Sequence, residues 1–359
     1  MGLAADFKKW AAAHAPDALE AGSARADIVV LDSMCTLHAF SPREEDARPK
    51  LDQLADRLWS TAAACCNEGA TVVICFDRQS STTRYKLKTQ AKRHRSERVW
   101  TEQEVDALIA RRDLPSGSDW PDFLSHRHLR ARAVEALACE VLEIFKRSAS
   151  CRGVVRMIVH NGRASGPAQV ADQHGGVEDV SEDAPSMGEA DIAIPLWTRR
   201  LVAERPGASA AILTVDTDLV PIMLSHGGEN CSVLLTHAQQ HHRQCIHTAV
   251  LAACVRRLYG LTHVEFVVVC ILKGTDFCGP LVRGIPSWHD TLRWAGEHLR
   301  SSAGRPIVRA DGSLDTAQLL RLASAVVMHK PKASVNPPNA AQREALEFNV
   351  RYWTELRET

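Results

Sequence analysis

The strongest constraint on the fold is a series of five short apolar runs, each bounded by polar residues and too short for a typical helix. The runs are Asp27–Leu31, Thr71–Phe76, Val154–Val159, Ala210–Val215 and Cys231–Leu235. Between them, residues 51–58 and 134–144 place Leu, Val and Ile on one face of a helix. Apolar strands that alternate with helices predict an α/β fold, in which a mostly parallel central sheet is flanked by helices.

Two long segments interrupt this alternation. The first separates the second and third runs by far more chain than one crossover helix needs. We expect an insertion there, over about residues 84–149, with a helix at Glu102–Arg112, a break at Pro115–Ser118 and a long helix from about Phe123 to Lys146. The second segment, Asn161–Met187, is rich in Gly, Ser, Asp and Glu, which predicts a mobile loop.

The last part of the chain is expected to be helical. Candidate helices cover Trp288–Arg300, Leu314–Val327 and Ala341–Leu356, and a Pro-containing linker precedes the last of them. The run Val264–Leu272 is ambiguous, because its Val content favours a strand while its length permits a buried helix.

The composition of the 359 residues, 45% hydrophobic and 24% charged, excludes disordered, collagenous and fibrous proteins. No apolar run approaches the roughly 18 residues of a membrane-spanning helix, and Met1–Glu20 lacks the apolar centre of a signal peptide. We therefore expect a soluble, intracellular protein. The eleven cysteines are expected to be reduced, with Cys65 and Cys66 packed into the core from a helix.

Charge is balanced overall, with 43 basic and 43 acidic residues, but it is separated along the chain. Between Arg78 and Arg98, eight Lys and Arg residues occur with one acid, Glu97. Between Asp172 and Asp191 there are seven acids and no Lys or Arg. This separation favours a protein that binds phosphates with one segment and a divalent metal with another. The alternative is two unrelated solvated surfaces.

Acidic residues follow the predicted strands at equivalent positions. Asp32, Asp77 and Asp216 each end an apolar run, and Asp218 comes two residues after the last of them. Because the carboxyl ends of parallel strands line one edge of a sheet, we expect these four carboxylates to converge there. For any one of them, capping of the next helix is an equally good explanation.

Clustered carboxylates need a cation if they are to stay ionised together. Oxygen-only ligands favour Mg²⁺ or Mn²⁺, and a pair of such ions about 4 Å apart is suited to phosphodiester hydrolysis. A zinc site is less favoured, because the spacing of its candidate ligands is irregular. Those ligands are His237, His241, His242, Cys245 and His247. No phosphate-binding loop, dinucleotide fingerprint or nucleophile elbow occurs.

Five motifs, in order, resemble those of the flap endonuclease/XPG superfamily of structure-specific 5′ nucleases. They are Val29–Ser33, Val73–Arg78, Gly188–Asp191, Val215–Asp218 and Cys270–Cys278. The N-terminus, Met1–Trp10, is similar to the opening segment of that family. The resemblance covers residues 1–286 apart from the two long segments. It implies a PIN-like fold and implies that Val264–Leu272 is a helix.

The loop before Lys86, two residues longer than in the cellular flap endonucleases, and the run Phe76–Ser80 are more similar to the divergent members of large DNA viruses. The resemblance implies a location in the nucleus, at a viral replication site or in the cytoplasm.

The resemblance also implies a set of site residues. Seven acids would be catalytic and would bind two Mg²⁺ or Mn²⁺ ions: Asp32, Asp77, Glu189, Asp191, Asp216, Asp218 and Asp276. Lys86 and Arg93 keep the spacing of the two catalytic residues that contact the scissile phosphate from a helical arch. The implied nucleic-acid contacts are Gly2, Arg84, Lys86, Lys92 and Arg93.

The sequence differs from the family's motifs at two places. Asp191 stands where the family has Glu, and Gly284–Ser287 replaces its Gly-Ile-Gly-Pro hairpin for duplex DNA.

The implied arrangement is a single domain over residues 1–359. It consists of nuclease regions at 1–98 and 151–286, the arch at about 84–149 and a helical extension at 287–359.

These features favour a metal-dependent flap endonuclease or 5′-exonuclease acting on branched or free-ended DNA in replication, repair or recombination. One alternative is an RNA-directed nuclease of the exoribonuclease or host-shutoff kind. Another is a non-catalytic scaffold, which predicts lost metal ligands, and none is lost. The segment Glu347–Trp353 is expected to be either a core helix or a helix that binds a protein partner.

Overall fold

The computed structural model describes residues 5–21, 25–39, 50–77, 100–115, 119–163, 166–180, 190–237, 240–273, 282–283, 287–301 and 315–328, with positions 307, 309, 334–335, 340, 343–344 and 346–347. The chain forms two compact units. The larger unit contains Gly22–Val215 and Leu234–Arg243, and the smaller contains Met1–Ala21, Asp216–Val233 and Gln244–Thr359. The scheme of one domain over residues 1–359 stays a prediction.

The larger unit is built on a mostly parallel sheet, as predicted. Its strands lie in the order β7-β2-β3-β4-β5-β6. They are β2 (Ala26–Asp32), β3 (Cys66–Cys75), β4 (Val154–His160), β5 (Gln169–Asp172), β6 (Val177–Asp179) and β7 (Ala210–Thr214). The first four in spatial order are parallel, and β5 and β6 continue the sheet antiparallel. The predicted runs at 27–31, 71–76, 154–159 and 210–215 are therefore confirmed as strands. The fifth run is β8 (Cys231–His237), which precedes β9 (Gln240–His247).

The register of the parallel strands aligns their carboxyl ends. Asp32 is paired with Cys75, and Cys75 is paired with His160. On the other side of β2, Leu31 is paired with Leu213, so the next residue of β7, Thr214, ends that strand beside Asp32. The last residues of four strands thus form a common edge.

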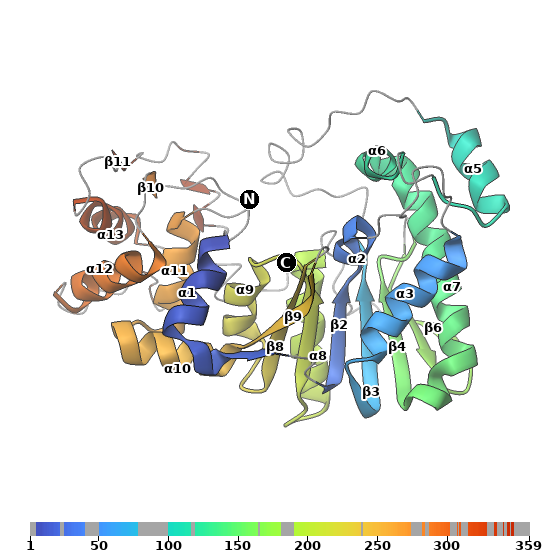
Figure 1. Cartoon of the computed structure of the whole chain (residues 1–359), viewed down its shortest axis with the longest axis horizontal. Helices are drawn as coiled ribbons and strands as arrows, with labels where there is room; N and C mark the ends of the chain where they lie inside the picture. Colours follow the sequence, from blue (N-terminus) through green and yellow to red (C-terminus); the bar gives the residue numbers. More distant parts are fainter. Residues whose placement is uncertain are drawn as a thin grey trace. The chain divides into compact units, whose positions relative to one another are not determined.

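Helices cover both faces of this sheet. Figure 1 shows α3 (Leu51–Ala63) beside α7 (Arg127–Arg152), and these helices contact each other and strands β2 to β5. Helix α8 (Ala190–Glu204) contacts β2, β3 and β7. The last two side chains of β4 point to opposite faces of the sheet. His160 meets Trp197 of α8, whereas Val159 and the α7 residue Ala138 both approach Gly162.

The segment expected to be an insertion contains three described helices: α5 (Glu102–Ala110), α6 (Trp120–Ser125) and α7. Thr101 caps α5 by accepting a hydrogen bond from the backbone of Glu104, whose carboxylate accepts one in return. Helix α7 is part of the core, because Leu137, Val141 and Phe145 are buried. The short α6 buries Trp120, whose Nε1 donates to the carbonyl oxygen of Leu37.

Two expectations from the sequence are wrong. The segment Asn161–Met187, expected to be a mobile loop, contains β5 and β6, which extend the sheet. Their few residues are mixed in polarity, and all of β6 is exposed, so no apolar run marks them. Cys66 is buried as expected, but it begins β3 rather than lying in a helix.

The smaller unit is mainly helical. Its described elements are α1 (Ala5–His14), a 3₁₀ turn (Pro16–Ala18), β1 (Leu19–Ala21), α9 (Leu219–His226), α10 (Thr248–Tyr259), α11 (His263–Lys273), β10 (Val282–Arg283), α12 (Trp288–Ser301), α13 (Thr316–Met328) and β11 (Ser334–Val335). The ambiguous run at 264–272 is α11, the helix that the resemblance implies. The predicted helices near 288–300 and 314–327 are confirmed as α12 and α13. The third, at 341–356, falls almost wholly outside the described residues.

An aromatic cluster forms the core between α1, α10, α11 and α12. Phe7 of α1 meets Trp288 edge to face with ring centres 5.4 Å apart, and Trp10 stacks on Phe266 at 6.2 Å. The indole nitrogen of Trp10 donates to the hydroxyl of Tyr259 at 3.0 Å. Helix α1 is therefore fixed by both packing and a buried hydrogen bond. In the described part of the chain, no helix has the length and apolar character needed to cross a membrane.

We predict that Gly296→Ala destabilises the smaller unit by about 1–3 kcal/mol, the cost typical of an overpacked core. A Cβ at Gly296 of α12 would overlap the carbonyl oxygen of Tyr259 at the end of α10. Alanine is otherwise about 1 kcal/mol better than glycine inside a helix, so the sign of the change separates close packing from helix propensity. Urea unfolding measures it, with exposed Glu297→Ala as the control. A urea midpoint equal to or above that of the unmodified protein would contradict the close approach.

Candidate active site

Asp32 is the last residue of β2, and its carboxylate is almost completely buried, with 4% exposure. Its Oδ2 accepts hydrogen bonds from Cys35 Sγ at 2.8 Å and Thr214 Oγ1 at 3.0 Å. Its Oδ1 accepts one from the backbone N–H of Met34 at 3.1 Å, near the start of α2 (Ser33–Ala39). The helix-capping explanation therefore holds for one oxygen of Asp32. It does not account for the acidic residues that surround the side chain.

Two further carboxylates lie at the N-terminus of α8. Asp77, which follows β3, accepts a hydrogen bond at Oδ1 from the backbone N–H of Ala190 at 2.9 Å. Asp191 lies in the first turn of α8 and is buried, with 7% exposure. The N-terminus of a helix carries partial positive charge, which favours acidic side chains there. The fold thus places three predicted acids of the larger unit, Asp32, Asp77 and Asp191, within electrostatic reach of one another.

Burial, followed by the negative charges of Asp191 and Asp77, raises the pKa of Asp32 from 3.8 to about 7. The hydrogen bonds from Cys35 and Thr214 act in the opposite direction. The same surroundings raise the pKa of the Cys35 thiol well above its usual value, through burial first and the Asp32 charge second. A bound divalent cation would oppose this shift, because it favours the ionised form of the carboxylate.

The chemistry of this donor set fits a hard divalent cation. The acids brought together here offer carboxylate oxygens, and a cation would relieve both the cost of their burial and their mutual repulsion. Among the residues that the structure describes, no group of three or more His, Cys, Asp or Glu side chains could by itself hold a metal ion. Glu189, the remaining implied ligand in the sequence of the larger unit, lies outside the described residues.

The smaller unit contains two more of the predicted acids. Asp218 is buried, with 1% exposure, and its backbone N–H donates to Oδ1 of Asp216 at 2.9 Å. Helices α9 and α11 are in contact, and burial followed by the charge of Asp218 raises the pKa of the Cys270 thiol in α11. Asp218 therefore lies against the helix that precedes Asp276 in the sequence.

Several predicted residues lie outside the described residues. They are Gly2, Arg84, Lys86, Lys92, Arg93, Glu189 and Asp276, together with the hairpin positions 284–286. Of the disfavoured zinc ligands, His237 belongs to β8 and His241 and His242 to β9, and the structure describes the side chains of Cys245 and His247. Nδ1 of His247 is hydrogen-bonded to Ser232 Oγ at 2.8 Å, which gives this imidazole a role in local packing.

Sequence reasoning missed two residues that contact Asp32 directly, Cys35 and Thr214. Thr214 is the one polar residue of β7 and ends that strand beside Asp32. A polar residue at the end of an apolar run could have indicated a contact with the acids. Cys35 carries a weaker signal, because a thiol near the start of a helix is usually a packing residue.

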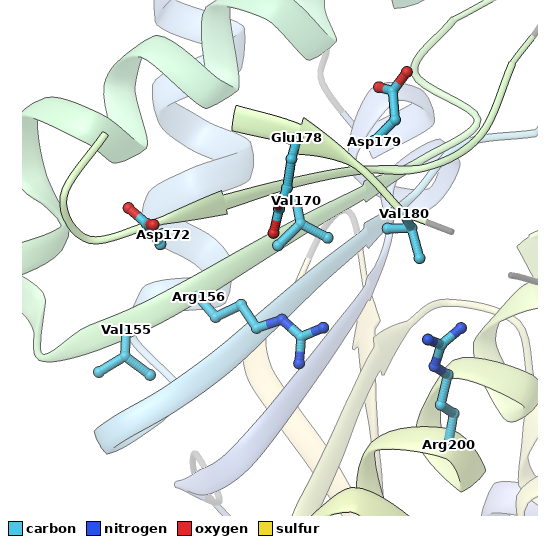
Figure 2. A pocket seen from close by; sticks show the side chains of 8 residues that line it. All are labelled: Val155, Arg156, Val170, Asp172, Glu178, Asp179, Val180 and Arg200. Atoms are coloured by element: carbon cyan, nitrogen blue, oxygen red, sulfur yellow. The ribbon is translucent and has the colours of Figure 1, made fainter. Parts of the chain in front are cut away.

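A hollow of about 590 Å³ lies elsewhere on the larger unit. Figure 2 shows the residues that line it: Val155, Arg156, Val170, Asp172, Glu178, Asp179, Val180 and Arg200. None of the predicted site residues is among them. Both arginines pair with Glu204, at 3.0 and 3.2 Å, so much of their charge is already compensated.

We predict that Asp32→Asn removes a pH-dependent loss of stability in buffer with a chelator. The pKa of Asp32 is raised from 3.8 to about 7. The folded protein therefore binds more protons than the unfolded chain in this range, and stability falls as the pH rises from about 4 to 7. The full effect is on the order of 4 kcal/mol, at 1.36 kcal/mol for each pKa unit. The free energy of unfolding of Asp32→Asn, relative to the unmodified protein, should therefore increase between pH 5 and pH 8.

Asp27→Asn, at the opposite end of β2, is the matched control. Hydrogen bonds from Ser209 lower the pKa of Asp27, the backbone N–H contributing most. Its stabilising contribution is fully present above the usual carboxyl pKa and is lost only as the pH falls through the lower folded value. Asp27→Asn should therefore destabilise the protein by the same amount at pH 5 and pH 8. Parallel pH profiles for the two variants would contradict the proposed surroundings of Asp32.

No model of a protein family matches this chain, and no curated protein matches it. The solved structures that are similar to it include two at 10% sequence identity, each with a TM-score of 0.43. One is the T5 D15 protein co-crystallized with metal ions, where the match covers 92% of this chain and 89% of that one. The other is human GEN1 in complex with Holliday junction DNA, where it covers 95% of this chain and 71% of that one.

Proposed function

We propose that this protein is a divalent-metal-dependent 5′ nuclease of the flap endonuclease/XPG kind, which hydrolyses phosphodiester bonds in branched or free-ended DNA. The observation that carries the proposal is the buried carboxylate of Asp32, at the carboxyl edge of a parallel sheet beside Asp77 and Asp191. A buried group of like charges is costly unless a cation compensates it. The five acidic motifs in the family's order support the same function.

In the proposed mechanism, seven acids hold two Mg²⁺ or Mn²⁺ ions. They are Asp32, Asp77, Glu189, Asp191, Asp216, Asp218 and Asp276. When bound, such ions supply activation of the attacking water and stabilisation of the leaving oxygen. Asp77 and Asp191 contribute their charge from the N-terminus of α8. Asp191 is one methylene shorter than the family's Glu, so a water is proposed to complete its reach to the metal.

Lys86 and Arg93 are proposed to contact the scissile phosphate, and Arg84 and Lys92 to bind neighbouring phosphates. Contacts to phosphates position a strand without reading its bases, so the selected feature would be the structure of the DNA and not its sequence. The proposed arch lies within residues 84–149. Because α7 belongs to the core of the larger unit, we propose that the part that surrounds a single strand ends before Arg127.

Asp216→Ala should abolish cleavage of a 5′-flap DNA at saturating Mg²⁺ without unfolding the protein. The change removes a proposed metal ligand and also relieves repulsion from Asp218, so stability in metal-free buffer should hold or rise. Asp56→Ala, which removes an exposed acid from α3, is the matched control and should cleave normally. Retained turnover in Asp216→Ala would exclude the two-metal assignment.

The same assay separates the alternatives. Matched DNA and RNA flaps distinguish a DNA nuclease from an RNA-directed one by their relative turnover. A non-catalytic scaffold would cut neither substrate under any metal condition, although it would still bind nucleic acid.

A bulky protein cap on the free 5′ end of the flap should stop cleavage, because the arch is proposed to thread over that end. Ordering of the arch on binding costs conformational entropy, so affinity should be moderate and should fall steeply with salt. Each neutralised phosphate contributes a slope of about −0.7 for a single strand. Initial rates on capped, uncapped and closed circular substrates provide the measurement. Equal rates on all three would exclude threading, and the segment would then be a partner-binding insertion.

A further inference from the structure

We infer that Cys35 and Thr214 are positioning residues of the proposed metal site, which hold Oδ2 of Asp32 and leave one lone pair of Oδ1 for the cation. The inference rests on the proposed function and deepens it, because it names the side chains that fix how the buried carboxylate is offered to a metal. Neither residue belongs to the seven-acid set.

The hydrogen bonds of Asp32 account for most of its accepting capacity. An ionised carboxylate has about four acceptor positions, two on each oxygen. On Oδ2, both are taken, by Cys35 Sγ at 2.8 Å and Thr214 Oγ1 at 3.0 Å. On Oδ1, one is taken by the backbone N–H of Met34 at 3.1 Å. Counting donors from the described residues alone, one position, on Oδ1, remains for a proton or a cation.

The two donors come from different elements, so they hold the carboxylate from separate directions. Thr214 ends β7, the strand paired with β2, and Cys35 lies in the first turn of α2. The thiol is itself held, because Sγ accepts a hydrogen bond from the backbone N–H of Val215 at 3.1 Å. The S–H bond can then donate to Asp32 Oδ2, and Sγ also lies 3.2 Å from Thr214 Oγ1, so the two donors support each other. Rotation of the carboxylate would break at least two of these hydrogen bonds.

Simple packing is the competing explanation for a buried cysteine, and the chain contains controls for it. Cys75 is fully buried, and both Asp32 and Asp77 affect the pKa of its thiol, yet its side chain makes no hydrogen bond to either acid among the described contacts. Cys66 is also buried and donates to the carbonyl oxygen of Ala62 within its own region of the chain. Removing either thiol opens a similar cavity without removing a donor to Asp32.

The test uses the full-length protein, stripped of metal and titrated with MnCl₂, with the dissociation constant measured by calorimetry. The variants are Cys35→Ala, Cys35→Ser, Thr214→Val and the controls Cys75→Ala and Cys66→Ala. Loss of a partner that orients a metal ligand typically weakens binding 10- to 100-fold. We expect Cys35→Ala and Thr214→Val each to weaken Mn²⁺ binding by about tenfold or more. Cys35→Ser keeps a donor and should restore most of the affinity, and both controls should bind as the unmodified protein does.

The outcomes separate this inference from the proposed function. Unchanged affinity in Cys35→Ala or in Thr214→Val would overturn the positioning role, as would an equal loss in Cys75→Ala. If Cys35→Ala does not fold, Thr214→Val tests the same oxygen in a side chain of nearly the same shape. If the unmodified protein binds no Mn²⁺, the proposed function fails and the inference fails with it. If it binds Mn²⁺ and cleaves DNA while the variants bind equally well, only the inference is overturned.

Discussion

The carboxylate of Asp32 is removed from water at the end of β2, and the parallel sheet provides the surroundings that bury it. The pairing of β2 with β7 and β3 brings Thr214 and Cys75 to its two sides. A strand at the edge of the sheet could not provide this enclosure. The cost of an ionised group in this position is large, and the raised pKa of Asp32 expresses that cost. Folding therefore favours either a proton or a cation on this side chain.

The N-terminus of α8 adds partial positive charge beside the acids, which the strand ends do not provide. Three like charges near one another would favour separation, but Asp77 accepts a backbone N–H of α8 and Asp191 lies in its first turn. The partial positive charge of the helix end offsets part of their repulsion, by an amount on the order of 1 kcal/mol. Helix α8 packs against β3, and its fully buried Trp197 meets His160 at the end of β4. The same packing that stabilises the larger unit thus keeps its acids together.

The sequence predicts the parallel strands well because their residues are apolar on both faces, a pattern that few other structures share. It does not predict β5 and β6, since Gln169–Asp172 mixes polarities and Val177–Asp179 is wholly exposed. The α11 run is undecidable from its own residues, because seven buried side chains in succession fit a strand or a core helix equally well. Of the site, Asp32, Asp77 and Asp191 are found from strand ends and motif resemblance. Thr214 and Cys35 are missed because their role depends on a register that no local pattern encodes.

The donors around Asp32 bear on the choice between proton and cation. If only apolar side chains surrounded the Asp32 carboxylate, burial would keep it protonated at neutral pH. A protonated carboxyl group is a poor metal ligand. Hydrogen bonds from Cys35 and Thr214 lower the pKa of Asp32 from the value that burial and the neighbouring acids would otherwise give it, so the pKa stays at about 7. A thiol is a weak donor, so it contributes this stabilisation without holding the negative charge as strongly as an ammonium or guanidinium group would. The three donors, Met34, Cys35 and Thr214, fix the orientation of the carboxylate, so the side that faces Asp77 and Asp191 is decided by the fold before a proton or a cation binds.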